Sequence, residues 1–433
     1  MSKPLAGGMP LRAASSVRVM LWTLLLVYTL NFLDRQIIGI LAESIKVEFK
    51  LQDWHIGLMT GPAFAVLYAV LGVPIARYAD KGSSNRVKLM SACLAVWSVM
   101  TALCGAAQNF GQMLLARIGV GIGEAGCTPT AHSLISDTVA PEKRSSAIAF
   151  FGLGIPIGSM LGLIIGGVIS DLYGWRTALL MAAAPGLLLA FALPFLIREP
   201  RHSREAAGAV PASSGGGFRH FLAGLTEIFS SRAFTFVFVA ASLTAFLSYG
   251  KGVWILILFQ RSHGFSAGET GLLLGIVLGV AGLLGTWLGG QIADRYGSQD
   301  KRYVLLLPAI GMVIATPILF FGYAATDWRV AILLLFLPTA LNAAYYGPAY
   351  ACVQGLVRPE ARAVAASMVV FGQNLIGLGL GPLAFGALSD ALMPMAGAES
   401  VRWVLYGAAW LGIIPAYFFW RASLRLGAEL KSG

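Results

Sequence analysis

The sequence predicts an all-α membrane protein with about twelve transmembrane helices in two pseudo-symmetric six-helix bundles. Three observations lead to this fold class. Of the 433 residues, 57% are hydrophobic and only 12% are charged, and the mean hydropathy is +0.75. Apolar segments recur at lengths that can cross a hydrocarbon core of ~30 Å. A polar connection near the middle of the chain divides these segments into two equal sets.

The predicted spans follow one another along nearly the whole chain. They cover residues 17–41, 55–79, 87–108, 110–136, 145–170, 175–197, 233–259, 267–293, 302–323, 328–356, 361–388 and 401–421. The first span follows three basic residues and so resembles a secretory signal peptide. We predict that it is the first transmembrane helix, because no small-residue cleavage site follows and the apolar run continues to Leu41.

The domain organisation follows from the long polar connection between Arg198 and Ser231. It contains the segment Pro-Ala-Ser-Ser-Gly-Gly-Gly at 211–217, a composition typical of a flexible linker. The sequence therefore predicts an N-terminal bundle over 1–200, a cytoplasmic linker over 201–231 and a C-terminal bundle over 232–433.

The basic residues predict how the chain lies in the membrane. The net charge is +11, and most of the 31 lysine and arginine residues fall in loops that lie on one side if the N-terminus is cytoplasmic. This asymmetry follows the positive-inside rule and predicts a multi-pass protein of the cell (inner) membrane with both termini in the cytoplasm. The same dispersion argues against a nucleic-acid partner. We expect a monomer in the lipid bilayer.

Four cysteines, Cys93, Cys104, Cys127 and Cys352, lie in apolar stretches without CxxC spacing. They support neither a disulfide framework nor a metal site, and no cofactor is expected. The segment Gly-Ile-Gly-Glu-Ala-Gly at 121–126 matches GxGxxG but lies inside a predicted membrane helix with no strand before it. Close helix packing explains its glycines better than a dinucleotide site does.

The predicted helix over 110–136 contains two charged residues, Arg117 and Glu124. A charge at the bilayer centre costs at least ~2.5 to 3.5 kcal/mol, so it normally has a partner and marks a substrate or proton pathway. Seven residues make about two turns, which places both side chains on one face roughly 10 Å apart. Asp34 and Arg35 in the first helix are the proposed partners. The alternative is a buried ion-pair network that only fixes helix packing.

Short segments repeat between the two halves. Ala-Arg-Tyr-Ala-Asp-Lys at 76–81 matches Gly-Gln-Ile-Ala-Asp-Arg at 290–295, and Pro-Glu-Lys-Arg at 141–144 matches Pro-Glu-Ala-Arg at 359–362. Parallel halves of this kind are typical of transporters with a substrate site at their interface. Glycines at four-residue spacing, Gly154 to Gly166 and Gly271 to Gly279, predict closely packed faces along which the two bundles move.

The repeat also bears on the substrate site. Lys251 takes the place of Arg35 in the second half, and Asn342 takes the place of Glu124. The cation is therefore duplicated and the acid is not, which predicts that the N-terminal half holds the titrating groups. We expect Lys251, Asn342 and Tyr345 to contribute to substrate binding. The alternatives are a lysine that reaches the membrane interface and polar residues that join helices.

The repeated loop Gly290-x-x-x-Asp294-Arg295-x-Gly297 resembles the signature loop of the major facilitator superfamily. The first copy differs, because Ala76 and Ser83 replace glycines and Lys81 replaces arginine. The resemblance implies that Asp80 and Asp294 lock one conformation. The predicted lock residues are Asp80, Arg86, Asp137, Arg144, Asp294, Arg295 and Arg362. The alternative is that these loops only set the orientation in the membrane.

Further segments are similar to the spinster branch of that superfamily, which transports lysolipids and sphingolipid phosphates. They are Asn31-Phe-Leu-Asp-Arg35, Arg117-Ile-Gly-Val-Gly-Ile-Gly-Glu124, Pro141-Glu-Lys-Arg144-Ser and Gly154-Ile-Pro-Ile-Gly158-Ser. The resemblance implies that Asp34 and Glu124 take part in proton coupling, and Arg35 and Arg117 are placed to pair with them or with an anionic headgroup. The same charges also resemble those of organic anion:proton symporters.

We therefore predict a secondary transporter, linked to protons, that moves an amphipathic anionic substrate such as a lysophospholipid or sphingoid phosphate by alternating access. The second interpretation is a proton-coupled importer of small organic anions. A membrane enzyme that modifies lipids is disfavoured, because the sequence contains neither a metal-ligand cluster nor a GxSxG nucleophile motif.

Overall fold

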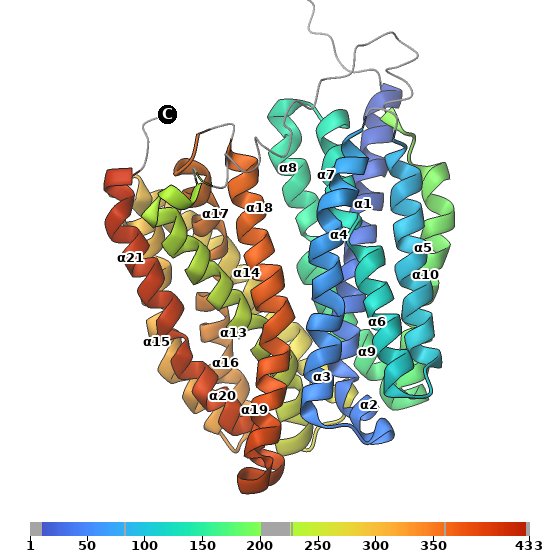
Figure 1. Cartoon of the computed structure of the whole chain (residues 1–433), viewed down its shortest axis with the longest axis vertical. Coiled ribbons are helices and arrows are strands. Elements are labelled where there is room, and N and C mark those ends of the chain that lie inside the picture. The colour runs from blue at the N-terminus through green and yellow to red at the C-terminus, as the bar shows by residue number, and fades with distance from the viewer. Residues whose placement is uncertain (1–10, 82–83, 201–225, 227, 359–360, 430–433) are drawn as a thin grey trace, which may run out of the picture.

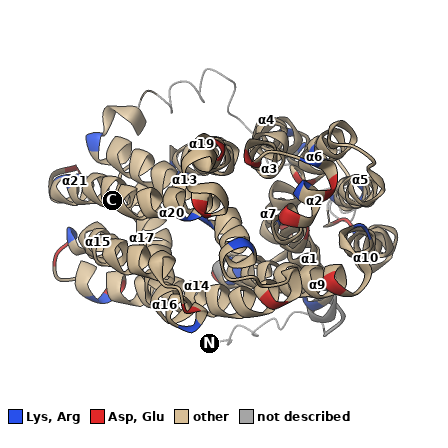
Figure 2. Ribbon diagram, turned by 90° about the horizontal axis from the view of Figure 1, so that it is seen from below, with Lys and Arg blue, Asp and Glu red and all other residues tan. Residues whose placement is uncertain are grey.

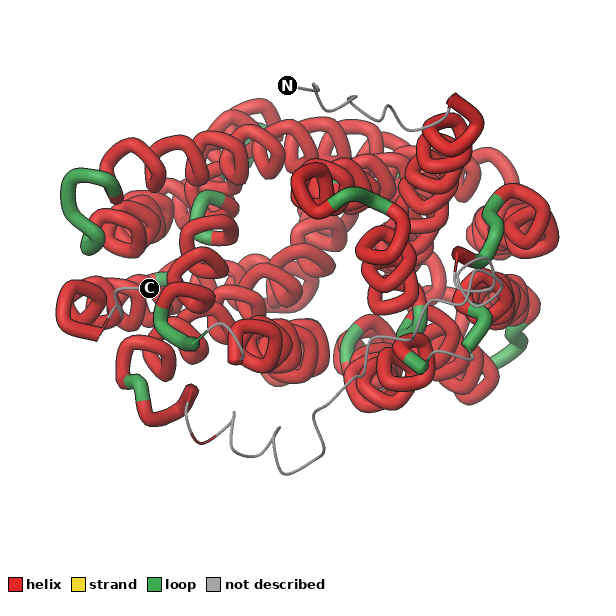
Figure 3. Tube along the Cα trace, turned by 90° about the horizontal axis from the view of Figure 1, so that it is seen from above, coloured by secondary structure: helices red, strands yellow, loops and turns green. Residues whose placement is uncertain are grey.

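The computed structural model describes residues 11–81, 84–200, 226, 228–358 and 361–429, without the side chains of 11–16, 80, 145 and 363. Within these residues the chain is helical and contains no strand (Figures 1 and 3). The first half comprises α1 (Leu11–Ile40), α2 (Ala42–Phe49), α3 (Asp53–Thr60), α4 (Pro62–Asp80), α5 (Arg86–Ala106), α6 (Phe110–Glu124), α7 (Cys127–Thr138), α8 (Pro141–Gly152), α9 (Gly154–Tyr173) and α10 (Trp175–Leu196).

The second half comprises α13 (Arg232–Ser262), α14 (Ala267–Gly297), α15 (Tyr303–Ala324), α16 (Trp328–Ala343), α17 (Tyr346–Gly355), α18 (Arg362–Gly372), the π-helix η2 (Gln373–Leu380), α19 (Gly381–Ala396), the 3-10 helix η3 (Gly397–Glu399), α20 (Ser400–Leu411) and α21 (Ile413–Glu429). The expectation of an all-α protein is confirmed.

The number of membrane crossings also agrees with the sequence. Ten described helical stretches are long and apolar enough to cross a membrane. The last, Val364–Glu429, is 66 residues long and contains two crossings, because α18 to α19 and α20 to α21 run in opposite directions (Figure 1). The broken pair α6 and α7 provides one more crossing. The prediction of about twelve transmembrane helices is confirmed.

The helices form two bundles that lie side by side, α1 to α10 in one and α13 to α21 in the other (Figures 1 and 3). The first helix begins at the same end of the molecule at which α21 ends, as expected for an even number of crossings. Most of the linker predicted over 201–231 lies outside the described residues, so the domain boundaries stay a prediction.

The predicted fourth transmembrane helix is broken directly after its acidic residue. Helix α6 ends at Glu124 and α7 begins three residues later. Pro129 explains the break, because it has no N–H to donate to the carbonyl of Ala125. In the second half, α16 and α17 are separated in the same way, and Pro348 stands four residues after Ala344. Both repeats therefore interrupt the helix next to the position shared by Glu124 and Asn342.

The two glycine stripes pack against different partners. The stripe from Gly154 to Gly166 in α9 faces α1 of its own bundle. Gly271 in α14 faces α9 of the other bundle, where an added Cβ would lie 2.1 Å from the carbonyl oxygen of Leu163. The expected contact between bundles is confirmed for α14. It is wrong for the α9 stripe, because α1 already occupies that face.

The two bundles approach closely at the end opposite to the start of α1. We call this the closed end; it comprises α2, the start of α3, the end of α9, the start of α14 and the junction of α19 with α20 (Figure 1). Figure 2 views this end and shows charged residues of both signs among the helix ends. In the predicted orientation, with cytoplasmic termini, the closed end faces the outside.

Candidate functional site

A buried ion pair joins α1 to α6 inside the N-terminal bundle. The Nε atom of Arg35 donates to the Oε2 atom of Glu124 over 2.7 Å, and the two side chains are 12% and 0% exposed. The predicted pairing of the two helices through these charges is therefore present. The Oε1 atom of Glu124 has no hydrogen-bond partner among the described residues. A single oxygen of the carboxylate holds the arginine.

Aromatic rings surround the guanidinium of Arg35. Its central carbon lies 4.9 Å from the ring centroid of Phe32, 4.9 Å from that of Phe64 and 4.6 Å from that of Tyr68. Cation–π contacts of a desolvated arginine contribute about 2 kcal/mol. Arg35 is therefore stabilised by these rings as well as by its bond to the carboxylate.

Asp34 of α1 and Arg117 of α6 are also buried. Asp34 is 4% exposed, and its two carboxylate oxygens lie 2.8 and 2.7 Å from the hydroxyl of Thr101, which donates to them. Arg117 is 3% exposed, lies 5.3 Å from the ring of Phe64, and its Nε atom has no partner in the described part of the chain. Asp34 and Arg117 interact electrostatically. Asp34, Arg117 and Glu124 are thus buried close to Arg35 without complete pairing of their charges.

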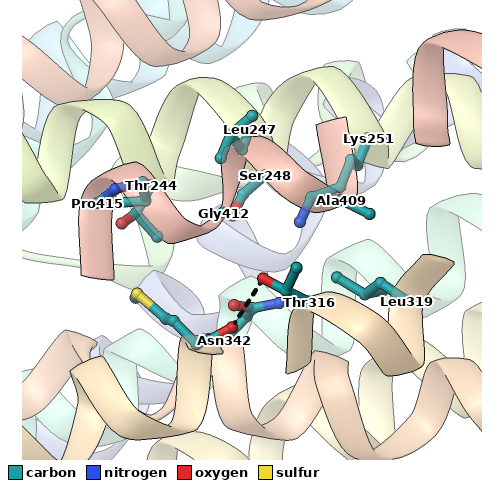
Figure 4. Close-up of a pocket in the computed structure, with 11 residues that line it drawn as sticks. Thr244, Leu247, Ser248, Lys251, Thr316, Leu319, Asn342, Ala409, Gly412 and Pro415 are labelled. Carbon is teal, nitrogen blue, oxygen red and sulfur yellow. Dashed lines mark hydrogen bonds between the residues drawn. The ribbon is translucent and has the colours of Figure 1, made fainter. Parts of the chain in front are cut away.

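The substrate-binding residues predicted in the second half meet at one cavity. Lys251, Asn342 and Tyr345 line a cavity of about 300 Å³ that is bounded by α13, α14, α15, α16 and the start of α17. Figure 4 shows a smaller pocket beside it, where Lys251 and Asn342 lie near Thr316. Lys251 forms no hydrogen bond or ion pair with another described residue. Arg35 does not line this cavity, so the predicted cations occupy two places.

Two tyrosines of the site were not predicted from the sequence. Tyr68 covers Arg35, and Tyr249, two residues before Lys251, is the residue of α13 that interacts electrostatically with Arg35. A tyrosine in an apolar helix gives no sequence signal of its own. Tyr345 accepts a hydrogen bond from the Nε2 atom of Gln373 over 3.1 Å, so it also joins two helices, as the alternative interpretation holds.

The predicted lock residue Arg86 is the centre of a buried network in the N-terminal bundle. Its side chain is fully buried and donates to Asp137 Oδ2 over 2.6 Å and to Glu199 Oε1 over 2.5 Å. It also donates to the carbonyl oxygen of Ser133 over 2.9 Å. The network joins the start of α5 to α7 and to the segment after α10. Glu199 was not predicted, because it lies in a loop after a span.

Two other predicted lock residues, Arg144 and Arg362, make local contacts. Arg144 donates to the carbonyl oxygen of Val139 over 3.0 Å, and Arg362, its match in the repeat, donates to that of Gln354 over 3.1 Å. Asp294 and Arg295 are exposed, and Asp294 makes no ion pair with another described residue. The side chain of Asp80 is not described. In this conformation Asp294 therefore has no ion-pair partner among the described residues, and the role of Asp80 stays a prediction.

The described residues contain no group of three or more histidine, cysteine, aspartate or glutamate side chains that could hold a metal ion. All four cysteines are buried and free.

Two bundles of membrane-spanning helices with charges buried among them define a membrane transporter. The chain belongs to the Major Facilitator Superfamily, whose family model matches residues 24–382.

Relatives and solved structures narrow this assignment. The chain is 36% identical over 425 residues to an MFS-type efflux pump of Mycolicibacterium smegmatis, covering 97% of this chain and 95% of the relative. It is 26% identical over 428 residues to protein spinster homolog 1 of Xenopus tropicalis, covering 93% and 80%. A crystal structure of a bacterial homolog to the human lysosomal transporter spinster, inward-facing and unoccupied, superposes with a TM-score of 0.87 at 29% identity, covering 98% and 100%. The predicted spinster-like branch is confirmed.

A crystal structure of a D-xylose-proton symporter has a TM-score of 0.68 at 19% identity, covering 94% of this chain and 97% of the symporter. This likeness shows the shared fold alone.

Proposed function

We propose that the protein is a proton-linked transporter of an amphipathic anion, such as a lysophospholipid or a sphingoid phosphate. The observation that supports this proposal is the bond between Arg35 and a single oxygen of the fully buried Glu124. A buried arginine that is held by one titratable carboxylate can exchange this partner for an anionic ligand.

Protonation couples to binding through this exchange. A proton on Glu124 cancels its charge and weakens its hold on Arg35. The guanidinium then offers two parallel N–H donors to a phosphate or carboxylate headgroup. Arg117, whose Nε atom is unpartnered among the described residues, adds a second cation on the same side. Substrate binding and protonation of Glu124 therefore favour one another.

The cavity beside Lys251 suits the remainder of an amphipathic ligand. Its lining is largely apolar and includes Ile255, Leu278, Leu319 and Leu335, with a volume of about 300 Å³. A volume of this order holds part of a lipid tail. Lys251 supplies a point charge there, without the fork geometry of arginine. The relatives named as spinster homologs and as an efflux pump support transport as the function.

A second candidate is coupled transport of small organic anions. The cluster of Asp34, Arg35, Arg117 and Glu124 favours an anionic group and does not itself require a tail.

The experiment is a comparison of equilibrium binding to the purified protein. The three ligands are a lysophospholipid, its uncharged monoacylglycerol analogue and a short sugar acid. We expect the lysophospholipid to bind most tightly and its binding to weaken above the pH at which Glu124 loses its proton. Equal binding of charged and uncharged lipids would overturn the proposal, and tight binding of the sugar acid alone would establish the second candidate.

A further inference from the structure

A five-residue segment occurs once in each bundle at the closed end. It reads Gly167-Val-Ile-Ser-Asp171 near the end of α9 and Gly386-Ala-Leu-Ser-Asp390 in α19. The two segments share the glycine, the serine and the aspartate. Their separation equals about half the chain, as for the other repeated motifs. They are therefore the same element of the two halves.

Each aspartate accepts hydrogen bonds from the start of a helix in the opposite bundle. Asp390 accepts from the backbone N–H of Asp53 over 2.9 Å and from that of Trp54 over 2.7 Å, the first two residues of α3. Asp171 accepts from the backbone N–H of Gly268 over 2.9 Å, the second residue of α14. These N–H groups have no partner within their own helices, and a carboxylate is favoured there by the helix dipole.

Each glycine brings the two backbones together one turn before its aspartate. A Cβ added at Gly167 would lie 2.3 Å from the carbonyl oxygen of Ala267, and one added at Gly386 would lie 2.6 Å from that of Asp53. Residues four apart lie on the same face of a helix. The glycine therefore sets the close approach, and the aspartate caps the helix that approaches.

The contact between the Gly386–Asp390 segment and the start of α3 is reinforced by further ion pairs and hydrogen bonds. Arg261 of α13 donates to Asp53 over 2.8 Å and to Glu43 over 2.7 Å. Lys46 pairs with Asp53 over 2.5 Å, and the hydroxyl of Ser389 donates to the same carboxylate over 2.6 Å. Asp53 is fully buried, and the bundles meet there through charge-assisted hydrogen bonds.

We propose that these two segments are a matched pair of gate elements, in which Asp171 and Asp390 hold the closed end shut by capping α14 and α3 of the opposite bundles. Opening this end separates each aspartate from its helix start, so both caps break in every transport cycle. The pair acts on the equilibrium between conformations, whatever the substrate.

The test measures the distance across the closed end by double electron–electron resonance. Spin labels are attached to cysteines introduced at Val47 and Ala398, two exposed positions in different bundles. The native cysteines are buried and do not compete. We expect Asp171→Asn and Asp390→Asn each to raise the ratio of open to shut distances roughly two- to fivefold, because the amide still accepts a hydrogen bond but lacks the negative charge that the helix dipole favours. The double variant is expected to combine the two factors, because the sites are separate.

Asp327→Asn is the matched control. Asp327 accepts a hydrogen bond from the N–H of Arg329 over 2.8 Å and so caps α16 within its own bundle. The distances in this variant are expected to equal those of the wild type. Gly167→Ala and Gly386→Ala provide a second, steric route and are expected to shift the ratio in the same direction as the aspartate variants. If the aspartate and glycine variants that fold all match Asp327→Asn, the proposal is overturned.

Discussion

The Nε atom of Arg35 lies 2.7 Å from the Oε2 atom of Glu124, and the glutamate is fully buried. Arg117, about two turns earlier on α6, keeps an Nε atom with no partner among the described residues. The acid of α6 therefore binds the base of α1. A proton on this acid or an anion on this base therefore changes the same contact.

Glu124→Gln is expected to remove the response of the conformational equilibrium to pH. The amide keeps the shape of the protonated carboxyl group but cannot gain or lose a proton. The measurement is the distance distribution across both ends of the molecule at acid and alkaline pH. Asp34→Asn is expected to reduce the response only in part, because Asp34 is bonded to Thr101 and not to Arg35. A full pH response in Glu124→Gln would contradict the role given to this residue.

Arg35→Lys is expected to weaken binding of an anionic lipid although the charge is kept. Lysine lacks the planar fork that binds two oxygens at once. The loss of one charge-assisted hydrogen bond costs about 1.5 to 3 kcal/mol, which corresponds to roughly one to two decades in affinity. Titration calorimetry with a lysophospholipid measures this change.

The uncharged monoacylglycerol is the control ligand for Arg35→Lys, and its affinity should not change. Lys251→Gln is the companion variant, because Lys251 lines the cavity of the other bundle. Unchanged affinity for the charged lipid in both variants would leave these cations with a structural role.

The fold and the pairing of Glu124 with α1 were predictable because both depend on local properties of the sequence. Apolar length and buried charge are local properties, so the spans and the link between Glu124 and helix 1 could be inferred without coordinates. The break after Glu124 could also have been inferred, because Pro129 and Pro348 occupy matching places. The separation of Lys251 from Arg35 could not be inferred from their matching places in the repeat, since a repeat gives the depth of a residue in the membrane and not the direction of its side chain.

Contacts between residues that lie far apart in the chain could not be predicted from spacing alone. Asp390 bonds to the start of α3, more than 300 residues earlier in the chain, and Glu199 reaches back to Arg86 from a loop. A carboxylate in a loop or at a helix end is usually a solvated residue. Only the packing of distant helices gives these two acids their partners.

Arg86→Gln is expected to destabilise the N-terminal bundle. The fully buried guanidinium joins Asp137 and Glu199, and its removal takes a buried, charge-assisted partner away from both carboxylates. Breaking a buried pair in this way costs about 3 to 5 kcal/mol. Thermal unfolding of the purified protein measures the effect.

Arg176→Gln is the control variant. Arg176 pairs with Glu48 at the surface, where both side chains are at least 36% exposed. Surface pairs of this kind contribute about 1 kcal/mol or less. Equal losses of thermal stability in the two variants would contradict the buried network.

Asp294→Asn is expected to act in the direction opposite to Asp390→Asn. In this conformation Asp294 is exposed and forms no ion pair with the described residues, whereas Asp390 caps α3 across the bundles. If Asp294 locks the end that carries the termini, its bonds form only when the closed end opens. Asp294→Asn then destabilises the conformation in which the closed end is open. The fraction of molecules with the closed end shut therefore rises. Accessibility of a cysteine introduced near the termini measures this fraction, and Asp80→Asn tests the first copy of the loop. Accessibility equal to that of the wild type in both variants would show that these loops only set the orientation of the chain in the membrane.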